Sequence, residues 1–227
     1  MDKNQDYQEK LRQLSLQLFM SEENQRRIIA SDLHDHVGQA LAMLKFKLGK
    51  LKGDAVFCGL DRDIDEMRKL IDQIIKYTRD LTLELSPPIL HELGFSKALL
   101  WLCAQMKEKC ELNIVLKDEF NEKIENEKIR IALFRSVQEL LFNVVKHSGT
   151  LEARLTLQRL DGQLVIAIYD RGIGFEVDGK HSHGFGLFSI KERLSSLGGL
   201  LQINSELKKG TEIILRMKMD EFKHTDR

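Results

Sequence analysis

The stretch Asp170-Arg171-Gly172-Ile173-Gly174-Phe175, which follows directly on an apolar run, decides the fold. We predict a strand over 164–170 that ends at Asp170, and after it a glycine-rich loop over 171–186. A carboxylate at the end of a strand can accept a hydrogen bond from an adenine amino group. Gly172 and Gly174 carry no Cβ, so their backbone can approach a flat ring closely. Alone, the stretch would also fit an ordinary glycine turn with an aspartate.

Downstream, the loop ends in His183-Gly184-Phe185-Gly186-Leu187, and we predict a helix over 187–197 directly after it. Glycines with exposed N–H groups at a helix N-terminus form an anion site, where a triphosphate would bind. The short polar stretch between Gly174 and Gly184 can act as a lid over that site. Its histidines, at 181 and 183, are a weak sign of a metal site, because no third ligand accompanies them.

Upstream, we predict a helix over 126–147 with one polar and one apolar face. Glu139, Asn143 and Lys146 (or His147) follow one another at spacings of four and three, so they share a face. A carboxylate and an amide oxygen suit Mg²⁺, and a lysine offsets the charge of phosphate. The opposite face carries Leu133, Val137, Leu140, Leu141 and Val144.

These three pieces are weak one at a time and strong together. They occur in a fixed order, with a predicted strand before the second piece and a predicted helix after the third. The chain contains neither GxGxxG nor GxxxxGK[ST], which excludes the Rossmann and Walker types of nucleotide site. The combination therefore predicts a nucleotide site of another type.

The region that carries these pieces is predicted to be an α+β domain, with strands of antiparallel type on one side and helices on the other. We expect a further helix over 95–109 and a strand over 112–116. Asp161-Gly162 would join strands over 153–158 and 164–170 as a hairpin turn. Lys209-Gly210 would join strands over 200–205 and 212–217 in the same way.

The region before Ser86-Pro87-Pro88 is predicted to be helical throughout. One helix would span 6–51, with a possible break near its histidines, and a second would span 61–85. Both carry apolar residues at spacings of three and four. Two such helices cannot bury both stripes in an isolated hairpin, so we expect a homodimer in which two hairpins form a four-helix bundle. The alternative is a monomeric hairpin resting on the second domain.

The segment Asp32-Leu33-His34-Asp35-His36-Val37-Gly38-Gln39 lies on the first helix. His34 falls at the edge of the apolar stripe, and Asp35 and Gln39 share a solvent face. An unprotonated imidazole is a competent nucleophile, and a neighbouring carboxylate can hold its tautomer. His36 is the rival nucleophile, but we expect it to lie closer to burial and it lacks a glycine one turn on.

Composition limits the function classes. The chain has 227 residues with 35 basic and 35 acidic side chains, so it lacks the basic excess of a nucleic-acid binder, and we expect no direct nucleic-acid contact. Three cysteines without CxxC spacing indicate reduced thiols and no zinc site. No apolar run is long enough for a membrane span. We therefore expect a cytoplasmic protein, or the soluble portion of a longer or membrane-bound sensor.

The motifs together resemble a known family. Glu139…Asn143–His147, Asp170-x-Gly172-x-Gly174 and Gly184-x-Gly186-Leu187 resemble the ATP-binding boxes of the histidine kinase, gyrase, Hsp90 and MutL superfamily, which has a Bergerat-type α/β sandwich. The segment 32–39 resembles the phosphoacceptor motif of NarL/DesK-type histidine kinases, and 85–95 resembles the joint between their two domains. The resemblance covers about 28–217.

The resemblance implies a role for each matching residue. His34 would be phosphorylated at its ε nitrogen, with Asp35 as its activating base. Gln39, with Asp35, would serve dephosphorylation of the partner. Asn143 would bind Mg²⁺, with Glu139 nearby. Lys146 and His147 would lie near phosphate, and Asp170 and Thr211 would lie at the adenine. The pocket and its lid would be shaped by Gly172, Gly174, Gly184, Gly186 and Leu187.

The hypothesis is a two-component histidine kinase core with a lead-in at 1–27, a dimerisation and phosphoacceptor domain at 28–86, an ATP-binding domain at 87–220 and a tail at 221–227. It would phosphorylate His34 from ATP, pass the phosphoryl group to an aspartate of a NarL/LuxR-type response regulator, and also dephosphorylate that partner. The alternatives are an anti-sigma-type serine kinase on the same ATP fold, or a nucleotide-binding dimeric scaffold without transfer.

Overall fold

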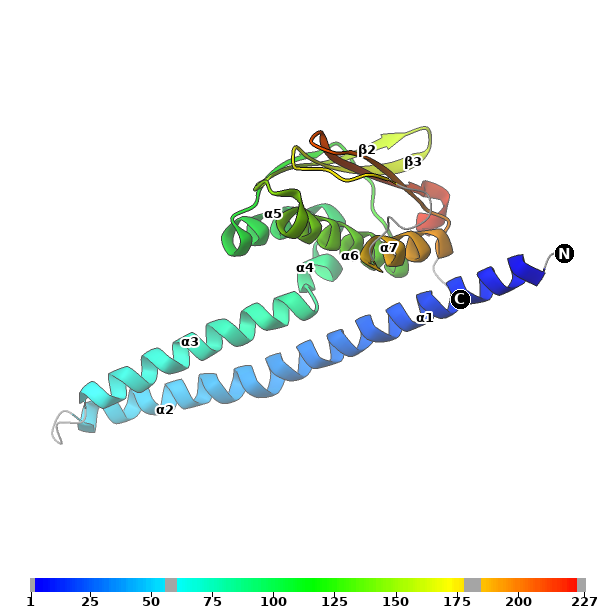
Figure 1. Ribbon diagram of the computed structural model, residues 1–227. Helices are drawn as coiled ribbons and strands as arrows, with labels where there is room; N and C mark the ends of the chain where they lie inside the picture. The colour runs from blue at the N-terminus through cyan, green and yellow to red at the C-terminus, as the bar shows by residue number, and fades with distance from the viewer. Residues whose placement is uncertain (1–2, 56–60, 178–184, 224–227) are drawn as a thin grey trace. The chain divides into compact units, whose positions relative to one another are not determined.

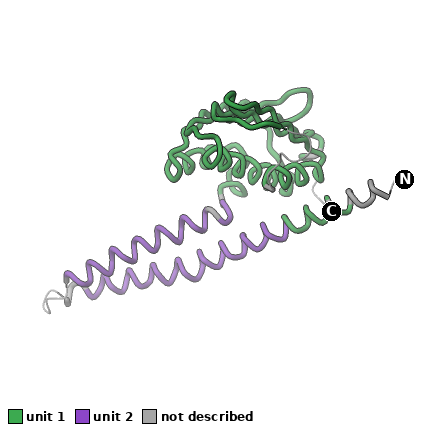
Figure 2. The backbone as a smooth tube through the Cα atoms, in the orientation of Figure 1, with its two compact units in different colours: residues 1–19, 89–227 green, residues 20–88 purple. Residues whose placement is uncertain are grey.

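The computed structural model describes residues 3–55, 61–177 and 185–223. It forms two compact units, one of residues 20–88 and the other of residues 1–19 and 89–227 (Figure 2). No helix among the described residues is both long and apolar enough to cross a bilayer. The predicted fold class is confirmed: a helical N-terminal region precedes a domain in which helices pack on one five-stranded sheet.

The helical region begins with α1 (Lys3–Asp32), which continues through a π-helical turn, η1 (Leu33–Gly38), into α2 (Gln39–Ala55). The next described helix, α3 (Asp61–Leu85), packs against α2. Lys45 Nζ on α2 lies 2.6 Å from Asp72 Oδ1 on α3. The two predicted helices are therefore present, and the expected break at the histidines is a π turn rather than an interruption.

Much of the predicted apolar stripe is exposed in the single chain. Ile71 and Thr78 of α3 are buried, whereas Ile74 keeps 46% of its surface exposed. The other exposed large apolar residues of these helices include Ile29, Leu44, Met67, Leu70 and Tyr77. An exposed stripe of this length indicates a surface that is covered by another chain or domain.

The second unit contains one five-stranded sheet in the order β1-β2-β3-β5-β4. Its strands are β1 (Asn113–Asp118), β2 (Glu152–Leu160), β3 (Gln163–Asp170), β4 (Leu200–Glu206) and β5 (Gly210–Lys218). Three helices cover one face of this sheet: α5 (Phe95–Cys110), α6 (Glu127–Asn143) and α7 (Phe185–Ser196) (Figure 1). The outer face of the sheet carries no helix in the described part of the chain.

Three features differ from the sequence prediction. β1 pairs with β2 in parallel, because α6 carries the chain across the sheet between them, so the sheet is not antiparallel throughout. The helix predicted over 126–147 leaves α geometry after Asn143 and ends in a π turn, η3 (Val144–Ser148). Two short helices were not predicted, α4 (Pro88–Glu92) and η4 (Met219–Lys223).

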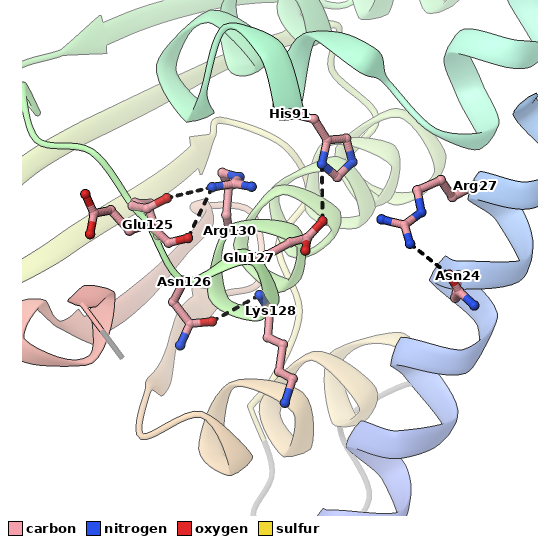
Figure 3. A network of polar contacts seen from close by, with 9 residues as sticks. Asn24, Arg27, His91, Glu125, Asn126, Glu127, Lys128 and Arg130 are labelled. Carbon is pink, nitrogen blue, oxygen red and sulfur yellow. Dashed lines mark hydrogen bonds and ion pairs between the residues drawn. The ribbon is translucent and has the colours of Figure 1, made fainter. Parts of the chain in front are cut away.

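The start of α6 is fixed by a side-chain cap at Asn126 (Figure 3). The side-chain oxygen of Asn126 accepts hydrogen bonds from the backbone N–H groups of Lys128 and Ile129, at 3.1 and 3.3 Å. Arg130 donates to the carbonyl oxygen of Ile124 at 2.9 Å. Capping satisfies N–H groups that a helix leaves unpaired at its first turn, so the register of α6 is set from this end.

The core lies between α6 and the sheet. Leu133, Val137 and Leu140 of α6 are fully or almost fully buried. Opposite them, Ile166 of β3 and Leu215 of β5 are also fully buried. Because side chains alternate along a strand, Asp170 lies on the same inward face as Ile166. The apolar face of α6 thus packs on the strands while its polar face stays beside the end of β3.

A prediction follows from the glycines of this unit. Gly210 has φ +86°, and a Cβ there would collide with the carbonyl oxygen of Asp170. Gly162 has φ +72° with open space around its Cβ position. We expect Gly162→Ala to cost about 1–2 kcal/mol of unfolding free energy from the left-handed backbone alone. Gly210→Ala should cost clearly more, about 3 kcal/mol or above, because strain and collision add. Urea unfolding of both variants tests this, and equal losses would contradict it.

Candidate nucleotide site and phosphoacceptor

One cavity of about 530 Å³ lies beside α6, at the ends of β3 and β5 and the start of α7. Its size suits a small organic ligand, since such pockets usually measure roughly 300–1,000 Å³. The lining residues are Leu140, Asn143, Val144, His147, Ser148, Ile168, Asp170, Gly174, Phe175, Glu176, Gly186, Leu187, Thr211 and Ile213.

Asp170 is the buried carboxylate of this cavity, with 5% of its surface exposed. Its Oδ1 accepts a hydrogen bond from the backbone N–H of Gly172 at 2.8 Å, which fixes the orientation of the carboxylate. Burial raises the pKa of Asp170 above its usual value, while the backbone hydrogen bonds of Gly172 and Thr211 lower it. A fixed acceptor on a largely apolar wall can select a ligand with an N–H donor.

The glycines of the Asp170 loop are needed for contacts within the protein. A Cβ on Gly172 would collide with the carbonyl oxygen of Ser148, and one on Gly174 with the carbonyl oxygen of Glu206. Gly174 lines the cavity but Gly172 does not. Both glycines therefore let the loop press against neighbouring backbone, a role that the sequence did not predict, and only Gly174 could also approach a flat ring in the cavity.

Two serines tie the loop to its neighbours. The backbone N–H of Ile173 donates a hydrogen bond to the carbonyl oxygen of Ser148 at 2.7 Å. Ser205 on β4 accepts a hydrogen bond from the N–H of Phe175 at 2.9 Å, and its hydroxyl lies 2.9 Å from that of Thr211. These bonds hold the loop and Thr211 on the same side of the cavity.

Glu139 lies on the polar face of α6 but not on the cavity wall. Its Oε2 is 3.7 Å from Arg193 Nη2 on α7. Burial raises the pKa of Glu139, and the positive charges of Arg193 and Lys146 oppose that rise. A Cβ on Gly186 would lie 2.6 Å from Glu139 Oε1, so the carboxylate packs directly on the first turn of α7.

The predicted phosphoacceptor lies in the helical unit, within the π turn η1. His34 is exposed, and the Oδ2 of the exposed Asp35 accepts a hydrogen bond from Ser31 at 3.1 Å. His36 is exposed as well, so the expectation that it lies closer to burial is wrong. The π turn widens the helix and changes the angular spacing on which that expectation depended.

The structure brings together seven of the predicted nucleotide-site residues on one cavity: Asn143, His147, Asp170, Gly174, Gly186, Leu187 and Thr211. Glu139, Lys146 and Gly172 do not line it. Gly184 and the two histidines before it lie outside the described residues. His34, Asp35 and Gln39 belong to the other unit.

Seven lining residues were not predicted as site residues: Leu140, Val144, Ser148, Ile168, Phe175, Glu176 and Ile213. Two of them, Ile168 and Ile213, had a signal in the sequence. Ile168 precedes Asp170 by two positions on its strand, and Ile213 follows Thr211 by two, so alternation puts each on the cavity side. The register then sets Ile168 opposite Ile213 and Asp170 opposite Thr211. Ser148 and Phe175 carried no such signal, because irregular backbone places them.

Two family models match the chain in sequence order. The model described as "Histidine kinase" matches residues 25–90, and the model described as "Histidine kinase-, DNA gyrase B-, and HSP90-like ATPase" matches residues 128–221. The chain belongs to the histidine kinase family. All lining residues of the cavity fall within the segment that the ATPase model matches, and that model implies that the chain binds ATP.

Curated relatives agree with the family. The chain is 34% identical over 211 residues to sensor histidine kinase ComP of Bacillus subtilis, covering 89% of the chain and 27% of that protein. It is 27% identical over 212 residues to oxygen sensor histidine kinase NreB of Staphylococcus carnosus, covering 93% of the chain and 60% of that protein. The chain thus spans less than two thirds of either relative.

A solved structure shows the same fold. The histidine kinase domain of the blue-light activated histidine kinase EL346 from Erythrobacter litoralis superposes with a TM-score of 0.52 at 12% identity. The match covers 81% of this chain and 96% of that domain.

The Asp170 carboxylate gives a prediction that separates binding from stability. Because burial raises its pKa in the folded state, the folded state holds the Asp170 proton more tightly than the unfolded state. Stability is therefore lost as the pH rises through the folded-state pKa and the carboxylate ionises. We expect Asp170→Asn to keep or raise the unfolding free energy at pH 7, since an amide oxygen can still accept from Gly172. ATP affinity should fall about 10- to 100-fold, because a charged acceptor is lost.

Calorimetric ATP titration and urea unfolding at pH 7 measure the two quantities on one preparation. Unchanged ATP affinity in a folded Asp170→Asn variant would contradict the assignment of Asp170 as a residue that binds ATP.

Proposed function

We propose that this chain is the catalytic core of a two-component sensor histidine kinase. It transfers the γ-phosphoryl group of ATP to His34 and then to an aspartate of a response regulator. The observation that carries the proposal is the presence, in one chain, of an exposed His34–Asp35 pair within the matched histidine kinase segment and an ATP cavity around Asp170.

The chemistry of the first step suits these side chains. An unprotonated ring nitrogen of His34, at the ε position, attacks the γ-phosphorus; an N–P bond forms and the bond to the ADP oxygen breaks. Asp35 accepts a hydrogen bond from the other ring nitrogen and stabilises the positive charge that develops on the imidazole. Ser31 supports this role, because its hydroxyl bonds Asp35 Oδ2 and restricts the carboxylate. Positioning and charge neutralisation supply most of the rate in such transfers.

The cavity supports specific roles for its lining residues. Asp170 accepts the adenine amino group, and Ile168 and Ile213 pack against the ring. Asn143 and Glu139 are the oxygen donors on α6 that fit Mg²⁺, a hard cation that takes carboxylate and amide oxygens and retains waters. Within the described residues no cluster of three His, Cys, Asp or Glu could hold another metal. Lys146 and the N-terminus of α7, with Gly184 and Gly186, would meet the phosphates.

We further propose the domain division 1–27, 28–86, 87–220 and 221–227, and a homodimer built from two α2–α3 hairpins. The exposed apolar stripe on these helices supports the dimer. The partner would be a response regulator receiver domain of NarL/LuxR type, and Gln39 would serve its dephosphorylation. The use of ATP supports action on the cytoplasmic side of the membrane.

A shallow basic groove supports a docking surface for the acidic partner. It lies on α2 and α3, and its charged lining residues are Lys45, Lys50 and Arg68, of which Lys45 is paired with Asp72. Phe46 also lines it and is largely exposed. A receiver domain presents a cluster of carboxylates around its acceptor aspartate, so the charges are complementary.

The central test is the chemistry of the phosphorylated product. We expect His34→Ala to abolish autophosphorylation while ATP affinity stays within about twofold, because His34 lies in the other unit from the cavity. His36→Ala is the matched control and should remain phosphorylated. Labelled ATP and acid treatment provide the measurement: phosphohistidine is lost in acid and phosphoserine is retained.

Acid-stable label on the wild-type chain would favour the serine kinase alternative. No label at all, with intact ATP binding, would favour the scaffold.

The dimer gives a separate prediction. Ile74→Glu places a charge in the exposed stripe of α3, and we expect it to weaken dimerisation by at least about 100-fold, because the charge would be buried without a partner. Gln73→Glu adds the same charge at an exposed neighbouring position and should leave the dimer intact. Sedimentation equilibrium distinguishes the two outcomes, and a dimer unchanged by Ile74→Glu would place the interface elsewhere.

A further inference from the structure

Arg193 is a buried cation on α7 that none of the sequence motifs identifies. Only 7% of its surface is exposed. Its Nη2 lies 3.7 Å from Glu139 Oε2 and donates to Ser189 Oγ at 3.3 Å. A buried arginine is costly to desolvate unless its charge is balanced, and Glu139 supplies that balance.

Glu139 is held from two points of the same helix. At the first turn of α7, the Gly186 backbone packs so closely that a Cβ would lie 2.6 Å from Glu139 Oε1. Two turns later, Arg193 faces the other oxygen, Oε2. The two contacts fix both oxygens of one carboxylate relative to α7, the helix that also contributes Gly186 and Leu187 to the ATP cavity.

The guanidinium of Arg193 is also covered on one flat face. Its central carbon lies 4.1 Å from the centroid of the Phe19 ring, within the same compact unit. An aromatic ring over a guanidinium adds a cation–π attraction and excludes water. The arginine is therefore restrained by Ser189, Glu139 and Phe19, and it acts as a rigid support for the carboxylate rather than as a mobile surface charge.

We propose that Arg193 is a positioning residue for phosphoryl transfer: it holds the Glu139 carboxylate against the first turn of α7 and so couples this helix to the metal-binding face of α6. The inference rests on the proposed kinase function, in which Glu139 lies beside Mg²⁺ and the phosphates. Arg193 itself does not line the ATP cavity, so its effect on the reaction passes through Glu139.

Two substitutions at position 193 distinguish the effect of the positive charge from the effect of the planar shape of the guanidinium. Lysine keeps the charge but lacks the planar fork that can meet Glu139 and Ser189 together. Glutamine removes the charge and keeps a polar side chain of similar length. We therefore expect Arg193→Gln to slow autophosphorylation at saturating ATP by about 10- to 100-fold, and Arg193→Lys by about 3- to 10-fold, as for other groups that orient a reacting centre.

The experiment compares the full-length variants Arg193→Lys, Arg193→Gln, Glu139→Gln and the double variant Arg193→Gln/Glu139→Gln. Lys191→Gln, an exposed cation on the same helix, is the matched control and should behave as the wild type. Autophosphorylation is measured at saturating ATP, and ATP affinity by calorimetric titration. The expected result is a loss of rate with affinity changed less than about threefold, and a double variant no slower than Glu139→Gln, because both residues act in one unit.

Three results would overturn the inference: an unchanged rate in Arg193→Gln, rate losses that multiply in the double variant, or a loss confined to ATP affinity. If Arg193→Gln does not fold, Arg193→Lys is measured in its place. Full activity in Arg193→Lys would then show that the planar guanidinium is not needed to position Glu139, which would overturn the inference. A wild-type chain without acid-labile phosphate would instead overturn the proposed function itself. The two failures are therefore distinguishable.

Discussion

The close packing of backbone around Asp170 is the constraint on which the rest of the structure depends. Gly172 meets the Ser148 carbonyl, Gly174 meets Glu206, and Gly210 meets the carbonyl of Asp170 itself. These approaches join the end of β3 to the turn after α6 and to the β4–β5 hairpin. The Asp170 carboxylate is buried at the centre of this packing, and the N–H of Gly172 fixes its direction. A buried acceptor that is oriented before a ligand arrives can select that ligand without reorganisation.

The same packing explains how α6 can serve the core and the site at once. Its apolar face is buried on β3 and β5, so the helix cannot rotate without exposing that face. Asn143 and Glu139 are consequently held on its other face, one on the cavity wall and one against α7. The proposed phosphoacceptor, His34, belongs to a different unit and lies in a different local feature, the π turn η1. The proposed phosphoryl transfer requires residues from both units.

The sequence predicted most of the regular structure because its patterns are local. The end of an apolar run placed Asp170 at the end of a strand, and the 3.6-residue period placed Asn143 on the polar face of α6. Thr211 came only from the family resemblance. Local patterns could not show the parallel pairing of β1, since strand direction depends on a crossover through the core. They also missed Arg193, because its partner Glu139 is 54 positions away in the chain. The π turn that exposes His36 was missed for a related reason: an ideal helical spacing contains no bulge.

Comparison of ATP with purine riboside triphosphate, which lacks only the 6-amino group, measures most directly whether Asp170 recognises adenine. Calorimetric titration of the wild-type chain with each nucleotide in the presence of Mg²⁺ gives the two affinities. We expect ATP to bind about 10- to 100-fold more tightly, because the analogue leaves the buried Asp170 carboxylate without its donor. Equal affinities would contradict the account, since they would show that the carboxylate at the end of β3 does not recognise the base.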